Sequence, residues 1–180
     1  RHYGLYAYRV AFLARFPDEV SAVAVNWIVF GSGGQSTYRA APVMERFTDA
    51  LPADAAQNRT VKAIGRRERL AGTGIHRVAV AIGGYVMPSG RMADFDGLQA
   101  SVLPEVTVAA LHHYAVKSHE EFQEKRVRGH ANSQFPERKR AKLDARLAEF
   151  DAGGVRNVDL ALNTGPMRAE AARLCAILRA

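Results

Sequence analysis

The residues best suited to chemistry lie close together in one stretch, between residues 111 and 129. His112 and His113 end an expected strand, Lys117 lies in the loop that follows, and Lys125 and Arg128 lie on the helix after the loop. An imidazole can bind a divalent ion, and ammonium and guanidinium groups bind phosphate. Grouped at a strand end and a helix start, these side chains indicate a site for a metal-phosphate ligand.

The geometry of a strand limits what the two histidines can do. Neighbouring residues point to opposite faces, so His112 and His113 cannot chelate one ion together, and one can face a site while the other packs in the sheet. The helix that follows has a clear start, because Ser118 and Glu121 have the spacing of a capping box. Backbone N–H groups at such a start attract anions. The alternatives are a structural histidine and a solvated basic helix face.

A glycine-rich segment, Gly31–Gly34, directly follows the apolar stretch Val20–Phe30. Glycines let a backbone approach a ligand closely, and open α/β sheets bind ligands at the carboxyl ends of their strands. The spacing matches neither a P-loop nor G-x-G-x-x-G, so a plain turn is the alternative. Asp94 and Asp96 form a D-x-D pair, but it lies in a polar stretch and we do not expect it to bind metal.

The elements that must position these groups follow from apolar spacing. Val20–Phe30 is apolar at both parities, which is typical of a central strand covered on both faces. Further strands are expected at residues 60–65, 75–82 and 106–114, with turns at 83–84 and 88–91. Helices are expected at residues 5–16, 43–50, 118–128, 137–150 and 166–179. This order predicts an α/β fold, a single domain over residues 1–180 with a mixed central sheet flanked by helices, in which residues 137–180 form a helical C-terminal portion.

Composition narrows the class of protein. The chain of 180 residues has a net charge of +7, which favours anionic partners such as nucleotides, nucleic acid or an acidic membrane surface. It has no apolar run long enough to cross a membrane. Cys175 is the single cysteine and lies in an apolar helical pattern, so we expect it to be buried and the protein to be cytoplasmic.

Several segments, taken in order, resemble the C-terminal two thirds of a group of bacterial glycosyltransferases related to family 2. Residues 27–34 resemble the group's W-x-x-F-G-x-x-G block, and residues 45–48 resemble its E-R-F-T block. Residues 112–129 resemble its N-H-Y-x-x-K-S-x-x-x-F-x-x-K-x-x-R-G block, except that His112 replaces the asparagine. Residues 61–64 and 75–77 show a weaker likeness. The resemblance implies the GT-A fold of nucleotide-diphosphosugar transferases.

The same resemblance implies a reaction and a set of roles. A sugar would pass from a nucleotide-diphosphosugar to a hydroxyl of a glycan or lipid-linked acceptor, with Mn²⁺ or Mg²⁺ as cofactor. By position in the matched blocks, the expected roles are metal contact for His113; donor diphosphate binding for Lys117, Lys125 and Arg128; general base for Glu45; and acceptor binding for Trp27, Phe30, Gly31 and Gly34. The metal-binding D-x-D-E-F segment of such enzymes would lie just before residue 5. This chain has Arg1-His2-Tyr3-Gly4 there, so we expect the donor-binding part to be truncated.

Two other classes of function stay open. A basic module could bind an anionic glycan, a nucleotide or nucleic acid without turnover, although no sequence-specific nucleic-acid motif is present. A structural subunit could pair with an active partner through a large exposed apolar face. Whether the chain is itself an enzyme, and whether it associates peripherally with a membrane, are likewise open at this stage.

Overall fold

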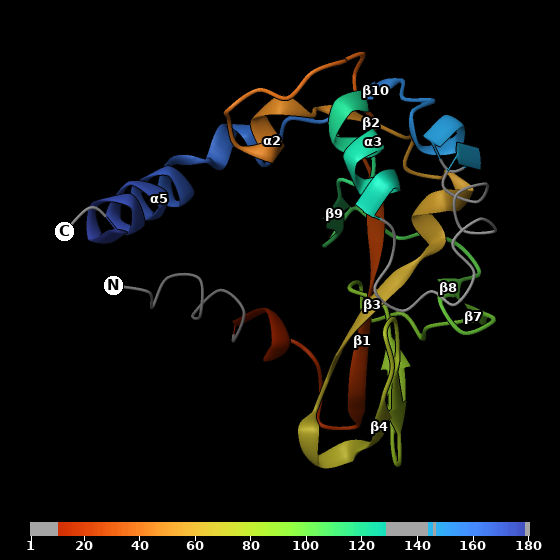
Figure 1. Ribbon diagram of the computed structural model, residues 1–180. Helices are drawn as coiled ribbons and strands as arrows, with labels where there is room; N and C mark the ends of the chain where they lie inside the picture. The colour runs from red at the N-terminus through yellow and green to blue at the C-terminus, as the bar shows by residue number, and fades with distance from the viewer. Residues whose placement is uncertain (1–10, 129–143, 146, 179–180) are drawn as a thin grey trace. The chain divides into compact units, whose positions relative to one another are not determined.

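The computed structural model describes residues 11–128, 144–145 and 147–178 (Figure 1). It is a mixed α/β structure. By its internal contacts the chain divides into two compact units, each built from two separate segments. The first unit comprises Arg1–Trp27 and Ala53–Leu111, and the second comprises Ile28–Pro52 and His112–Ala180.

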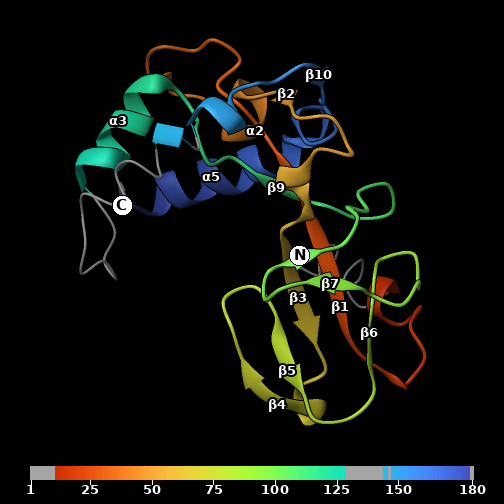
Figure 2. The same cartoon turned by 90° about the vertical axis from the view of Figure 1, so that its right-hand side faces the viewer.

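A mixed sheet organises the first unit. Strand β1 (Val20–Val29) lies between β3 (Val61–Gly65), which runs antiparallel to it, and β6 (Gly84–Val86), which runs parallel to it (Figure 2). Strand β9 (Leu111–His113) also pairs with β1. The expected central strand is therefore confirmed, and its apolar residues at both parities enter two clusters of core residues. One cluster is Phe16, Val23 and Val86, and the other is Ala24, Val61 and Met87.

The remaining elements of the first unit are short. They are the 3-10 turns η1 (Ala56–Arg59) and η2 (Arg67–Arg69), the pair β4 (Leu70–Thr73) and β5 (Val78–Val80), and the pair β7 (Phe95–Asp96) and β8 (Ala100–Ser101). The strand expected at residues 75–82 is thus shorter than predicted. The turn at residues 88–91 is confirmed by the hydrogen bond from Gly90 N to Met87 O. The glycines at 83–84 instead lead into β6.

A buried asparagine of β1 forms hydrogen bonds with three other segments of the first unit, and no pattern in the sequence predicts these contacts. Asn26 Nδ2 lies within hydrogen-bond distance of Asn58 O, Arg59 O and Ser101 Oγ, at 3.0, 3.0 and 2.9 Å. Its Oδ1 accepts the N–H of Glu105 at 2.9 Å. Because the amide of Asn26 has partners at both its ends, a polar group in the middle of β1 can be buried without the usual free-energy cost.

The second unit contains most of the helices. Its elements are α2 (Val43–Arg46), β2 (Asp49–Ala50), α3 (His119–Arg128), β10 (Val155–Arg156), η3 (Ala161–Asn163) and α5 (Gly165–Leu178), with β2 and β10 paired antiparallel. The helix expected at residues 43–50 ends at Arg46, because the next residues turn into β2. The expected strand at 106–114 is reduced to β9. The helices expected at 118–128 and 166–179 are confirmed within a residue or two, and those at 5–16 and 137–150 fall partly outside the described residues.

The expectation that Cys175 is buried is wrong. Cys175 is exposed on α5, together with Leu174 and Ile177, whose exposed fractions are 47% and 57%. Apolar spacing placed a helix there correctly, but spacing does not say whether anything covers the helix. Within the described part of the chain, no helix has the length and apolar character needed to cross a membrane.

Candidate functional site

The glycine-rich turn of the second unit is held by an aspartate from far along the chain. Asp151 Oδ1 accepts the N–H of Ser32 at 2.5 Å, and its Oδ2 accepts the Ser32 hydroxyl at 3.1 Å. His119 Nε2 lies 3.1 Å from the same Oδ2 and 3.4 Å from Ser32 Oγ. Burial pushes the pKa of Asp151 upward, but the hydrogen bonds from Ser32 and His119 outweigh it and hold the pKa below its usual value.

This close approach explains one glycine of the turn. A Cβ at Gly31 would lie 3.0 Å from both Asp151 Oδ1 and Phe150 O, so a side chain there would require these neighbours to shift by a few tenths of an ångström. Gly31 is buried, whereas Gly34 is exposed with a positive φ of 76°. Sequence reasoning found the glycines but missed Ser32, His119 and Asp151, and no local motif marks these three residues.

The start of α3 has the geometry of a capping box, as expected. Ser118 Oγ lies 2.7 Å from Glu121 Oε2 and accepts the N–H of Glu121 at 3.3 Å. Glu121 also forms an ion pair with Arg46 at 2.5 Å, and the Arg46 guanidinium lies 4.5 Å from the ring centroid of Phe47. Burial raises the pKa of Glu121, but hydrogen bonds from Arg46 and Ser118 outweigh this effect and lower it to about 2. Helices α2 and α3 are therefore joined by a charged pair.

The backbone at the start of α3 is not open to an anion. His119 N donates to Gln35 O at 3.0 Å, and Glu120 N donates to Ser36 O at 2.9 Å. Glu121 N is used by Ser118. The expected attraction of a phosphate to these N–H groups is therefore wrong, since the loop after Gly34 already takes them.

Lys117 adopts an unusual backbone conformation just before α3. Its φ is 61°, and among the described residues it is the one non-glycine residue with a positive φ. Its side chain is 47% exposed, and its ammonium nitrogen lies 3.8 Å from Glu121 Oε1. A lysine in the left-handed region costs about 1–2 kcal/mol relative to a right-handed conformation. Such strain is found preferentially at functional sites.

The other expected diphosphate cations lie further along α3. Lys125 Nζ donates to Ala115 O at 3.1 Å, which anchors the loop before the helix. Arg128 is exposed at the end of α3. Lys125 thus has a protein partner of its own in the loop before α3, besides its place on the helix.

The two histidines of β9 contact different aromatic rings. The His112 ring stacks on Phe30 with centroids 4.7 Å apart, and burial lowers the pKa of His112. His113 is half-buried, and its ring lies edge-on to Phe150 with centroids 6.3 Å apart. Among the described residues, no group of three His, Cys, Asp or Glu side chains could hold a metal ion. His113 therefore does not belong to a metal site preformed by the described residues.

Glu45, the expected general base, is clamped by an arginine of α5. Arg168 Nε donates to Glu45 Oε1 at 2.7 Å, and Arg168 Nη2 forms a second, shorter contact with Oε2. Hydrogen bonds from Arg168 and Thr164 lower the pKa of Glu45. Glu45 is thus a carboxylate at neutral pH, as a base must be, but a substrate hydroxyl has to share it with the guanidinium.

The expected acceptor residues do not all fall in one unit. Trp27 belongs to the first unit, where its ring centroid lies 5.7 Å from that of His76. Phe30 belongs to the second unit, where its ring is buried against His112 and Tyr114. Phe30 is only 1% exposed, so its ring offers little surface to a ligand.

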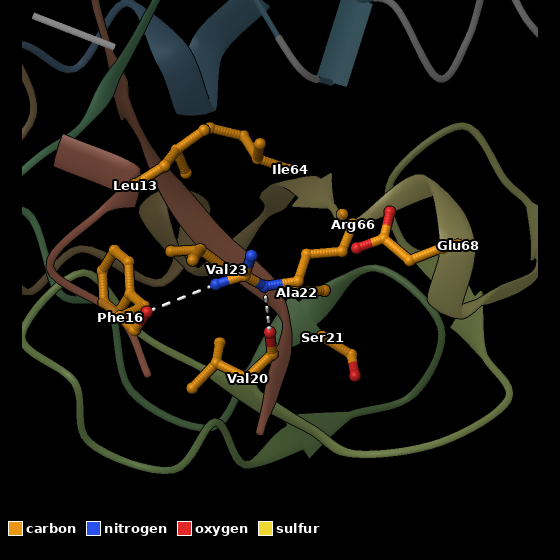
Figure 3. Close-up of a pocket in the computed structure, with 10 residues that line it drawn as sticks. Leu13, Phe16, Val20, Ser21, Ala22, Val23, Ile64, Arg66 and Glu68 are labelled. Carbon is orange, nitrogen blue, oxygen red and sulfur yellow. Dashed lines mark hydrogen bonds between the residues drawn. The ribbon is translucent and has the colours of Figure 1, made fainter. Parts of the chain in front are cut away.

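A cavity of about 240 Å³ in the first unit is lined by none of the expected site residues (Figure 3). Its lining residues include Phe16, Val23, Ile64 and Arg66. The Arg66 guanidinium donates to the carbonyls of Val20 and Phe16 at 2.9 and 3.3 Å, so the protein itself uses this cation.

Comparisons of the chain with protein-family models, with curated proteins and with solved structures found no match.

Proposed function

We propose that this chain takes part in the transfer of a sugar from a nucleotide-diphosphosugar to a hydroxyl of a glycan-type acceptor. The observation that supports the proposal is the left-handed backbone conformation of Lys117, which has a φ of 61°. The sequence resemblance assigns a diphosphate-binding lysine to this position, and here the lysine lies in a strained conformation between β9 and α3 with its side chain half-exposed. A glycine would meet the same backbone requirement without cost, so a lysine at this position is best explained by its side chain.

The reaction requires the protein to place a positive charge near the leaving nucleoside diphosphate. A nucleoside diphosphate that leaves a sugar gains negative charge, and a nearby cation stabilises it. In this proposal Lys117 supplies that cation, and its weak surface pair with Glu121 is given up when the diphosphate binds. Arg128 is a second candidate because it is exposed on the same segment.

Glu45 is the proposed base. Its carboxylate would accept the proton of the acceptor hydroxyl as the new glycosidic bond forms. The guanidinium of Arg168 fixes the carboxylate through two contacts, which orients it but also weakens it as a base. Among the described residues no group of three His, Cys, Asp or Glu side chains could hold a divalent ion, so the proposal assigns no step to one.

The test is a titration of the chain with UDP and GDP by calorimetry, for the native protein and for Lys117→Ala. We expect binding of one nucleoside diphosphate and a loss of affinity of about tenfold or more in the variant, as for a charge-assisted hydrogen bond. Lys62→Ala is the control, since Lys62 is a cation of β3 in the first unit. Equal affinities of native protein and Lys117→Ala would contradict the role of Lys117.

A second candidate is a basic module that binds anionic glycans or nucleotides without turnover. The net charge of +7 favours it, as does the engagement of Glu45 by Arg168. The two functions differ in salt dependence. A module held by surface charge would lose affinity for any polyanion steeply as salt rises, whereas a nucleotide site would keep its preference for a nucleoside diphosphate.

A further inference from the structure

The second unit has a polar hollow of about 340 Å³ beside the glycine-rich turn. It is lined by Gly34, Gln35, Ser36, Thr37 and Arg39, which are all polar residues or glycine. The hollow is open to solvent and is formed by one loop. The side chains of Gln35, Ser36, Thr37 and Arg39 can form hydrogen bonds with a polar ligand.

The loop that forms this hollow is anchored at both sides. The Gln35 side chain donates to Arg46 O on α2. On the other side, the carbonyls of Gln35 and Ser36 accept the first N–H groups of α3, and Tyr38 N donates to Glu120 Oε2 at 2.5 Å. A loop held at so many points keeps its shape before a ligand arrives, which lowers the entropy cost of binding.

Arg39 gives the hollow a positive charge, and a carboxylate that contacts the same loop, Glu120 of α3, accepts the Tyr38 N–H. Arg39 is exposed, and among the residues that the structure describes no carboxylate forms an ion pair with it. The nearby arginines differ, because Arg46 is paired with Glu121 and Arg168 with Glu45. The field of Arg39 reaches Glu45 and contributes to the lowering of the Glu45 pKa, so the hollow lies within electrostatic range of the proposed base.

The chemistry of the lining matches phosphate. A guanidinium donates up to five hydrogen bonds in a planar fork and is well suited to a phosphate group. The exposed side chains of Ser36 and Thr37 add two hydroxyl donors on the same loop. We propose that the loop Gly34–Arg39 binds a phosphate group of a substrate, with Arg39 as its principal cation.

This inference rests on the proposed function, and it names a phosphorylated substrate for the same unit. The phosphate could come from a phosphorylated acceptor placed near Glu45 or from the donor diphosphate. Both sources present the same chemistry to Arg39. The experiment below distinguishes them by using separate ligands.

The experiment measures the binding of inorganic phosphate, glucose 6-phosphate, UDP and GDP to the native chain, to Arg39→Ala and to Arg67→Ala. Arg67 is a matched control, because it is an exposed arginine of the first unit and its removal changes the net charge equally. We expect Arg39→Ala to lose about tenfold or more in phosphate affinity and Arg67→Ala to lose little. A selective loss for glucose 6-phosphate assigns the loop to the acceptor, and a selective loss for UDP or GDP assigns it to the donor.

Equal losses in Arg39→Ala and Arg67→Ala, or no loss in either, would overturn the proposal. Arg39→Lys keeps the positive charge but loses the planar guanidinium, and we expect its phosphate affinity to lie between those of the native chain and Arg39→Ala.

Lys117→Ala separates this inference from the proposed function. If Lys117→Ala abolishes nucleotide binding while Arg39→Ala changes nothing, the phosphate loop fails alone. If Arg39→Ala weakens phosphate binding while no nucleoside diphosphate binds, the proposed function fails alone.

Discussion

Arg46 of α2 and Glu121 of α3 form an ion pair at 2.5 Å, and their side chains are only 3% and 15% exposed. Because Arg46 is buried, its charge depends on Glu121 for compensation. Removing one partner of a buried pair leaves an uncompensated charge, which is far more costly than losing a surface pair. This pair holds together the two helices on which the loop Gly34–Arg39 is anchored.

We predict that Glu121→Gln lowers the free energy of unfolding by about 3 kcal/mol or more at pH 7. Urea denaturation of the native chain and the variant measures the effect. Glu124→Gln is the control, because Glu124 is exposed on the same helix. Equal midpoints for the two variants would contradict the structural role of the pair.

The same pair predicts an acid transition. The pKa of Glu121 is lowered from 4.5 to about 2, so the folded state favours the carboxylate. The stability that it contributes is fully present above pH 4.5 and is lost as the pH falls toward 2. In Glu121→Gln this part of the pH dependence should disappear. An unchanged slope of stability against pH between these values would contradict the prediction.

We predict that Asp151→Ala destabilises the second unit by about 1–3 kcal/mol, because the Ser32 N–H and hydroxyl would lose their acceptor. Amide hydrogen exchange at Ser32 is the measurement, and it should become faster. Asp54→Ala, at an exposed aspartate of the first unit, is the control. Because the pKa of Asp151 is lowered, its contribution to stability is also lost on acidification. Unchanged exchange at Ser32 would mean that the aspartate does not hold the turn.

Lys117 allows two substitutions that separate strain from charge. Lys117→Gly and Lys117→Ala both remove the ammonium group, but only glycine adopts a φ of 61° without cost. We predict that Lys117→Gly is more stable than Lys117→Ala by about 1 kcal/mol, measured by thermal or denaturant unfolding. Equal stabilities would show that the residue is not strained in solution.

Removing Arg168 should change the acidity of Glu45. Arg168→Ala takes away the strongest influence that lowers the Glu45 pKa, so that pKa should rise. The measurement is an NMR titration of the Glu45 side chain in the native chain and the variant. Arg173→Ala is the control, since Arg173 lies on the same helix and pairs with Glu170. A Glu45 titration that is the same in all three proteins would contradict the clamp.

The sequence was informative where the signal is local. The apolar residues at both parities of residues 20–30 predicted the central strand, because a strand covered on both sides must be apolar on both sides. The spacing of Ser118 and Glu121 predicted the start of α3, since a capping box lies within one helical turn. Both are confirmed at the positions expected.

Local patterns in the sequence could not predict contacts between residues that are far apart along the chain. Ser32 and Asp151 are 119 residues apart, and Glu45 and Arg168 are 123 residues apart. No periodicity or motif connects such pairs. The prediction that Cys175 is buried was wrong for a related reason. A helical pattern shows which side of a helix is apolar, but it does not show what packs against that side.

The most direct test of sugar transfer is the release of nucleoside diphosphate from nucleotide sugars in the presence of Mn²⁺ and glycan acceptors. With the donor-binding segment that the resemblance expects before residue 5 present in the assayed protein, we predict release with at least one donor, and a fall of at least tenfold when Glu45→Gln replaces the base with a neutral amide. An unchanged rate in Glu45→Gln would remove Glu45 from the reaction. No release from any donor, together with no binding of UDP or GDP, would contradict sugar transfer itself.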